Sequence, residues 1–122
     1  MSKPESIMID DVKYVRSDVL GTKESELMDG MPYQIVRTYS AGVFAGYVKS
    51  RVGQEVVMIK TRRIWYWNGA NSLSELAIHG TSKPSECKFA CEATHTLINA
   101  IEIIDVTEKA QKSLQGVQVW QK

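Results

Sequence analysis

Alternating apolar and polar positions in the first half of the chain predict an antiparallel sheet. Residues 33–39 are rich in β-branched and aromatic side chains and stop at a Ser-Ala-Gly turn, 40–42. Residues 43–51 predict a second strand, 52–53 supply a turn, and 55–66 predict a third and longer strand. Three consecutive strands with tight turns describe a meander, in which we expect a strong right-handed twist.

The second half of the chain carries the helical signals. Residues 72–80 begin with a cap candidate, Ser72, which a carboxylate follows three residues later, and they end at Gly80. This pattern predicts a short helix. Residues 107–114 predict a second capped helix, which Gly116 ends.

Three shorter segments complete the predicted sheet. Residues 87–91 alternate and predict a strand, and residues 96–106 are apolar and β-branched, which predicts a central strand. Residues 117–120 are a candidate edge strand. The predicted fold class is α+β, an antiparallel β-sheet core with two short helices.

The first 32 residues differ from the rest of the chain. Residues 7–15 predict a strand or hairpin, and residues 17–31 are polar and acidic, which predicts a linker or short helix. We therefore expect an N-terminal strand or hairpin with an acidic linker (1–32) and an α+β ligand-binding core (33–122).

The charge is unevenly spread along the 122 residues. A net charge of +1 combines −3 over 1–32, +5 over 33–66 and −1 over 67–122. A near-neutral total argues against sequence-blind binding to nucleic acid, whereas a local basic block fits a compact anion. No apolar run approaches the ~20 residues of a membrane helix, and the N-terminus lacks the apolar core of a signal peptide. We therefore expect a cytoplasmic protein without a membrane partner.

Residue types that perform catalysis are scarce. The chain has no glycine-rich phosphate loop, no Gly-x-Ser-x-Gly elbow and only two histidines. His79, Cys87, Cys91 and His95 are zinc-capable types, but the spacing of the cysteines is loose for a small zinc knuckle. On a strand the two cysteines would face one way as buried hydrophobes, the reading we favour. We expect no enzyme activity, no metal and no cofactor.

The run 62–72 is the densest chemical feature of the chain. It holds two arginines, three aromatic rings and several amide or hydroxyl donors. Aromatic faces stack on nucleobases, and guanidinium groups bind phosphates through two parallel hydrogen bonds. If the strand stays extended, the odd-numbered positions from 63 to 67 share one face and the even-numbered positions from 62 to 66 share the other.

The candidate ligand contacts combine phosphate-binding arginines, stacking aromatics and polar anchors at a helix start. They are Arg37, Tyr39, Arg62, Arg63, Trp65, Trp67, Asn71, Ser72 and Lys109. Each has a plainer alternative. Tryptophans of small β-proteins are more often core or subunit contacts, and Lys109 with Lys112 can form a solvated helix face.

Two strings resemble a family of small phage and prophage proteins. They are VRTYSAGVFAG at 36–46 and RRIWYWNGANSLSELA at 62–77, with later landmarks CKF at 87–89, EII at 102–104 and TEKA at 107–110. The resemblance covers roughly residues 33–120. Many members of that family carry only an unknown-function label, and some are Thoeris anti-defence proteins of the first described type.

The resemblance implies sequestration. It predicts an oligomeric sponge that holds a cyclic ADP-ribose isomer, glycocyclic ADP-ribose, without cleaving it and so blocks bacterial Thoeris defence. It also implies a second site for cyclic oligonucleotides such as a cyclic trinucleotide, and a homo-oligomer, a dimer or an assembly of dimers. The alternatives are a single-stranded nucleic-acid-binding module, an enzyme that degrades the signal, and a structural phage protein.

Overall fold

The computed structural model describes residues 23–121. The predicted strand or hairpin at 7–15 lies outside the described residues, as does the first part of the predicted linker. The described part, 23–31, is not helical: Glu24 forms an isolated bridge with Thr107, and Met28 forms one with Met31. The linker alternative is therefore the better description of 23–31.

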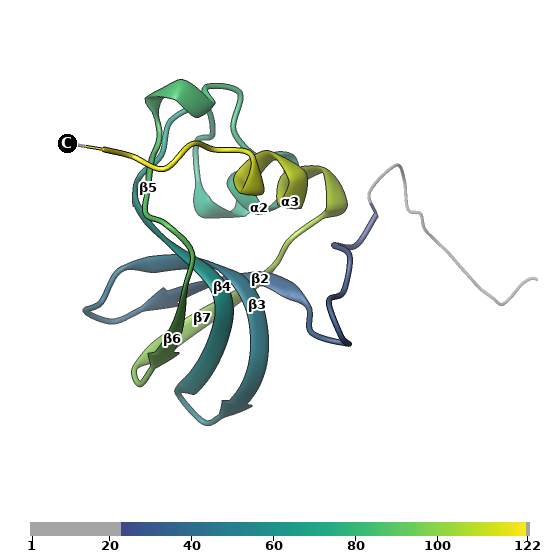
Figure 1. Cartoon of the computed structure of the whole chain (residues 1–122), viewed down its shortest axis with the longest axis vertical. Coiled ribbons are helices and arrows are strands. Elements are labelled where there is room, and N and C mark those ends of the chain that lie inside the picture. Colours follow the sequence, from purple (N-terminus) through teal and green to yellow (C-terminus); the bar gives the residue numbers. More distant parts are fainter. Residues whose placement is uncertain (1–22, 122) are drawn as a thin grey trace, which may run out of the picture.

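The sheet has six strands, and every pairing between neighbours is antiparallel. The path runs β5-β4-β3-β2-β7, and β6 pairs with β4 as well (Figure 1). The strands are β2 (Tyr33–Thr38), β3 (Val43–Val52), β4 (Glu55–Tyr66), β5 (Lys88–Phe89), β6 (Ala93–Leu97) and β7 (Ala100–Asp105). The predicted meander of three strands is confirmed in β2, β3 and β4, and so is the α+β class.

The prediction of one central strand at 96–106 is wrong. The segment contains the end of β6 and the whole of β7, and β7 lies at an edge of the sheet. Asn99 is in the connection, where its carbonyl accepts a hydrogen bond from Tyr39 N and its side chain donates to Ser40 Oγ. Asparagine favours turns, but the apolar residues before and after Asn99 made the segment look like one continuous strand, so the turn was not predicted.

Both faces of the sheet are buried because the sheet curls. β6 pairs with β4 while β7 pairs with β2, so this pair of strands joins opposite sides of the meander. The enclosed face carries an inner cluster, made of Val36, Phe44, Val56, Met58, Leu97 and Ala100. Burial of apolar side chains on both faces explains why the strands are richer in apolar residues than simple alternation requires.

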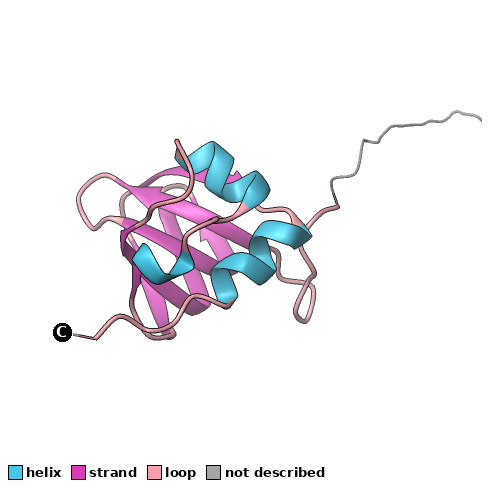
Figure 2. Ribbon diagram, turned by 90° about the horizontal axis from the view of Figure 1, so that it is seen from above, coloured by secondary structure: helices cyan, strands magenta, loops and turns pink. Residues whose placement is uncertain are grey.

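The helices cover the other face of the sheet (Figure 2). They are α2 (Leu73–His79) and α3 (Glu108–Gln115), and a short 3-10 helix, η2 (Pro84–Glu86), precedes β5. Both predicted helices are confirmed. None of the helices in 23–121 is long and apolar enough to cross a membrane.

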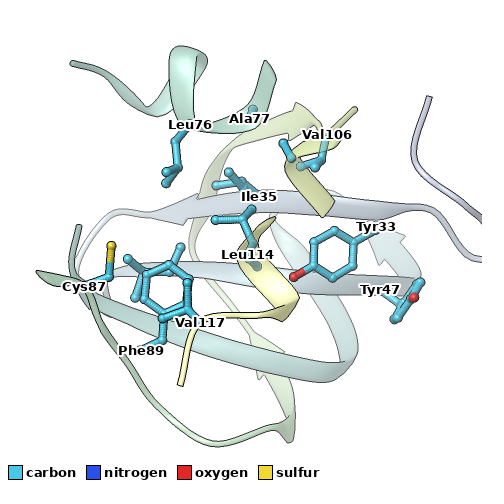
Figure 3. Close-up of a cluster of buried hydrophobic side chains, with 13 residues drawn as sticks. Tyr33, Ile35, Tyr47, Leu76, Ala77, Cys87, Phe89, Val106, Leu114 and Val117 are labelled. Carbon is cyan, nitrogen blue, oxygen red and sulfur yellow. The ribbon is translucent and has the colours of Figure 1, made fainter. Parts of the chain in front are cut away.

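A second core, the helix-side cluster, fills the space between the helices and the sheet. Figure 3 shows Leu76 of α2 and Leu114 of α3 on either side of Ile35, with Phe89 and Val117 close together nearby. Helical packing on one sheet face is the usual arrangement of an α+β fold.

The helix ends are closed by the residues that the sequence marks. Ser72 Oγ accepts a hydrogen bond from Glu75 N, and Thr107 Oγ1 accepts one from Ala110 N, so both act as N-caps. Gly80 ends α2 with a positive φ of 75°, a backbone conformation that favours glycine.

The segments flanking α3 and β5 are less regular than predicted. The predicted strand at 87–91 shrinks to the two residues of β5. The predicted edge strand at 117–120 is an isolated parallel bridge between Phe89 and Val119, beside a hydrogen bond from Trp120 N to Phe89 O. The C-terminal segment still runs along β5 (Figure 1).

Candidate ligand-binding site at the end of β4

A bulge in β4 decides which way its side chains point. Tyr47 pairs with Ile59 and Ala45 pairs with Arg62, so Lys60 and Thr61 together oppose Gly46. Lys60 has a φ of 48°. A Cβ on Gly46 would lie 2.7 Å from Thr61 Cα, so the bulge requires glycine on the facing strand.

The bulge reverses the alternation along β4. Before it, the even-numbered Val56 and Met58 belong to the inner cluster. After it, the even-numbered Ile64 belongs to the helix-side cluster, and the odd-numbered Arg63 contacts the ring of Phe44 in the inner cluster. The predicted alternation of faces is therefore correct for residues 62 to 65, which follow the bulge, but it cannot be extended back to the residues that precede it.

Arg62 points inward and is 4% exposed. Its Nε donates to Ala90 O (2.8 Å), and its Nη1 donates to Leu114 O (3.2 Å) and Val117 O (2.6 Å). Burial lowers the pKa of this guanidinium, although arginine remains charged in proteins. The structure thus makes Arg62 a tie between β4 and the end of α3 rather than an exposed phosphate ligand.

Arg63 points to the opposite face and stacks on two aromatic rings. Its guanidinium carbon lies 4.9 Å from the centroid of Phe44 and 5.3 Å from that of Trp65. Its Nε is buried and has no hydrogen-bond partner among the described residues. Stacking on the two rings holds the plane of the half-buried guanidinium in place.

His95 lies beneath this arginine. Its ring centroid is 4.9 Å from that of Phe44, and its Nδ1 has no partner among the described residues. Burial, and to a lesser degree the charge of Arg63, lower the pKa of His95. A neutral imidazole avoids adding a second charge beside Arg63.

A second bulge brings Tyr66 to the face of Arg63. Ile64 pairs with Phe89, but Tyr66 pairs with Lys88, which leaves Trp65 as the extra residue. Because Lys88 and Phe89 are neighbours on a strand, their side chains point to opposite faces, and Phe89 faces the helices. Tyr66 and Lys88 therefore share the face of Arg63, against the prediction that Tyr66 lies on the face of Arg62.

Lys88 links Tyr66 to the C-terminal segment. Its Nζ lies 6.0 Å from the ring centroid of Tyr66 and 5.2 Å from that of Trp120. We call the set Arg63, Trp65, Tyr66, Lys88 and Trp120 the cation–aromatic face. Its three rings are solvent-accessible, with Trp65 58%, Tyr66 50% and Trp120 42% exposed.

The other predicted contacts lie elsewhere or have other partners. Arg37 is exposed and pairs with Glu102 (Nε to Oε1, 2.8 Å), and Tyr39 is 81% exposed in the turn after β2. Trp67, predicted to share the face of Trp65, instead packs against the helix-side cluster, because the bulge at Trp65 reverses the alternation again. Lys109 is exposed on α3.

The start of α2 satisfies its own donors. Ser72 is the N-cap, and Glu75 Oε1 accepts a hydrogen bond from Asn71 N at 2.8 Å. Both side chains of Asn71 and Ser72 are exposed. Their geometry is that of a helix cap, one of the two readings that the sequence allowed.

The zinc-capable residues are dispersed. Cys87 is buried, whereas Cys91 is exposed, because β5 ends at Phe89 and the expected common face is lost. Within 23–121 no group of three or more His, Cys, Asp or Glu side chains is placed to hold a metal ion.

Sequence reasoning missed Phe44, Lys88, His95 and Trp120 as neighbours of the site. Lys88 lies inside the CKF landmark, and Trp120 is the third tryptophan of the chain, so both carried a signal. Phe44 lies in the 36–46 string and His95 in the zinc-capable series, but neither signal indicates proximity to Arg63, because that depends on pairing across strands.

The family model of a domain of unknown function, DUF6948, matches residues 31–114. The chain belongs to this family. The DUF6948 match includes Arg63, Trp65, Tyr66 and Lys88 and ends before Trp120. No curated protein and no solved structure matches the chain.

Proposed function

We propose that this chain is a phage- or prophage-encoded sponge. It binds glycocyclic ADP-ribose, a cyclic ADP-ribose isomer, and holds it without cleavage, so that bacterial Thoeris defence is not activated. The resemblance of 36–46 and 62–77 to Thoeris anti-defence proteins supplies the ligand class. The observation that carries the proposal is the cation–aromatic face, where an arginine and a lysine lie among three exposed rings.

The chemistry of the face suits a ligand with a base, ribose and pyrophosphate. Arg63 offers N–H donors to a phosphate, and Lys88, which lies beside the rings of Tyr66 and Trp120, offers a second cation. Trp65, Tyr66 and Trp120 offer flat surfaces for a base, which contribute about 1–3 kcal/mol for each stacked base in single-stranded nucleic-acid complexes.

The residue types on this face support sequestration. The face has no carboxylate, and its groups capable of proton transfer are Tyr66 and Lys88, whose ammonium lies 6.0 Å from the Tyr66 ring centroid. The neighbouring His95 is packed under Phe44, where it supports the aromatic surface.

Isothermal titration of the full chain with glycocyclic ADP-ribose tests the proposal. We expect saturable binding that Arg63→Ala weakens by about 10- to 100-fold, since a hydrogen bond to a charged group contributes about 1.5–3 kcal/mol. Lys109→Ala, an exposed cation on α3, is the matched control and should leave the affinity unchanged. Absence of binding contradicts the proposal.

Two further outcomes separate the rival functions. Ligand recovered from heat-denatured complex should be chemically intact by chromatography, and an altered product would show an enzyme instead. Tight binding to long single-stranded oligonucleotides, with steep salt dependence and none to the cyclic signal, would show a nucleic-acid module.

Assembly is a further part of the proposal. We expect a homo-oligomer, since symmetric copies can complete a site that is open on one side. Light scattering after size exclusion measures the subunit number, and a titration with cyclic trinucleotides tests the second site.

A further inference from the structure

A hollow of about 470 Å³ lies between the C-terminal segment and the chain that leads into β5. Pro84 and Ser85 of η2 form one wall with Cys87, and Gly116 with residues 118–121 forms the other. Trp120 is the only residue of the cation–aromatic face among the described lining residues. The hollow lies within the range of volumes, about 300–1,000 Å³, that small-molecule sites occupy.

The wall formed by the C-terminal segment is fixed to the sheet at two points. Arg62 Nη1 donates to Val117 O (2.6 Å), and Val119 forms a bridge with Phe89 that includes the hydrogen bond from Trp120 N to Phe89 O (2.9 Å). Val117 is itself buried against Phe89 and Cys87 (Figure 3). The hollow is therefore part of the fold, because its walls are hydrogen-bonded and packed.

The lining is polar but uncharged. The hydroxyl of Ser85 and the side-chain amides of Gln118 and Gln121 line it, and no hydrogen bond joins these groups to other residues in the described part of the chain. The half-exposed indole of Trp120 supplies a flat apolar surface. No described lining residue carries a charge.

We propose that this hollow is a binding site for an uncharged nucleoside. A planar heterocycle stacks on Trp120, where base–indole contact is favourable. The donors and acceptors on the edge of the base form hydrogen bonds with the two glutamine amides, and a ribose hydroxyl forms a hydrogen bond with Ser85. The hollow shares Trp120 with the cation–aromatic face, but its polar groups, Ser85, Gln118 and Gln121, are absent from that face.

Calorimetric titration of the full chain with adenosine tests this site. We expect saturable binding of one nucleoside per chain, and a loss of affinity of about fivefold for Gln118→Ala and for Ser85→Ala, the effect of one neutral hydrogen bond. Arg63→Ala should leave adenosine affinity unchanged, which separates this site from the proposed sponge site.

Tryptophan fluorescence provides a second measurement. Adenosine should quench emission in Trp65→Phe but not in Trp120→Phe, with thermal denaturation confirming that both variants fold. The proposal is overturned if adenosine binding does not saturate, if Gln118→Ala binds like the parent chain, or if quenching persists in Trp120→Phe.

Discussion

Arg62 and Arg63 are neighbours in sequence with opposite surroundings. Arg62 donates hydrogen bonds to three carbonyl groups at the junction of β4, α3 and the C-terminal segment. Arg63 lies on aromatic rings at the surface of the opposite face. The first arginine therefore ties the fold together, and the second is the one that we propose as a ligand contact.

Replacing the two arginines should separate these roles. Arg62→Met should lower the free energy of unfolding by about 2–4 kcal/mol, since several buried acceptors lose a charged donor. Arg63→Met should change it by less than about 1 kcal/mol while abolishing the gain in stability that glycocyclic ADP-ribose gives. Urea denaturation with and without ligand measures both effects, and equal destabilisation by the two variants would contradict the assignment.

The pH dependence of stability should report on His95. Its pKa is lowered in the folded state by burial and by Arg63, so the unfolded chain, with an ordinary value near 6.5, binds a proton first. Stability should be fully present above about pH 6.5 and should fall as the pH decreases below it. His95→Gln should remove this slope in denaturation midpoints measured from pH 7.5 to 5. The control His79→Gln, at the exposed end of α2, should keep it.

At the scale of the element, β4 is the strand that organises the site. It pairs with β3, β5 and β6, and its bulges at Lys60–Thr61 and at Trp65 direct its side chains. Bulges occur often beside functional sites because they redirect side chains. In β4 they place Arg63, Trp65 and Tyr66 together on one surface.

The first bulge carries backbone strain that a substitution can relieve. Lys60 has a positive φ of 48°, which costs a side-chain-bearing residue about 1–2 kcal/mol. Lys60→Gly should therefore raise the free energy of unfolding by about 0.5–1 kcal/mol. Lys49, the extra residue of a bulge in β3, is exposed and does not have a positive φ, so Lys49→Gly should lower the free energy of unfolding by a similar amount. Urea midpoints compare the pair, and a loss of stability in both would show that the bulge is unstrained.

Sequence patterns predicted the strands and helices better than the pairing of the strands and the faces to which their side chains point. The meander and both helices were visible because alternation, turn residues and caps are local signals. The turn at Asn99 was missed because apolar residues surround it. The bulge at Lys60 has no local signature, since it depends on Gly46 in the facing strand. For this reason the grouping of Tyr66 and Lys88 with Arg63 could not be predicted.

At the scale of the molecule, a single sheet separates two apolar clusters. The helix-side cluster joins the meander to α2 and α3, and the inner cluster joins it to β6 and β7. The meander strands contribute to both clusters, so neither can be lost while the other stays intact. Such coupling predicts one cooperative unfolding transition.

Truncations in the two clusters should destabilise the same transition. Leu76→Ala and Met58→Ala each remove a fully buried side chain and should cost about 2–5 kcal/mol. Far-UV circular dichroism and tryptophan fluorescence should give coincident curves for each variant. Their effects should add in the double variant, because the residues lie in separate clusters. Separate transitions for the two probes would contradict a single cooperative unit.

The extra residue in the bulge at Lys60 also shifts the alternation of side chains along β4 by one position. Deleting this one residue would restore regular alternation, and every side chain from Thr61 to the next bulge would change sides. Arg63 would then turn toward the helices and Arg62 toward the solvent, although no arginine had been replaced. In an alignment with a related chain that lacks the bulge residue, the position of the one-residue gap, before or after Arg62 and Arg63, decides which arginine of the related chain is aligned with Arg63. The register of β4, rather than the presence of arginine, is therefore the feature to compare between members of the family.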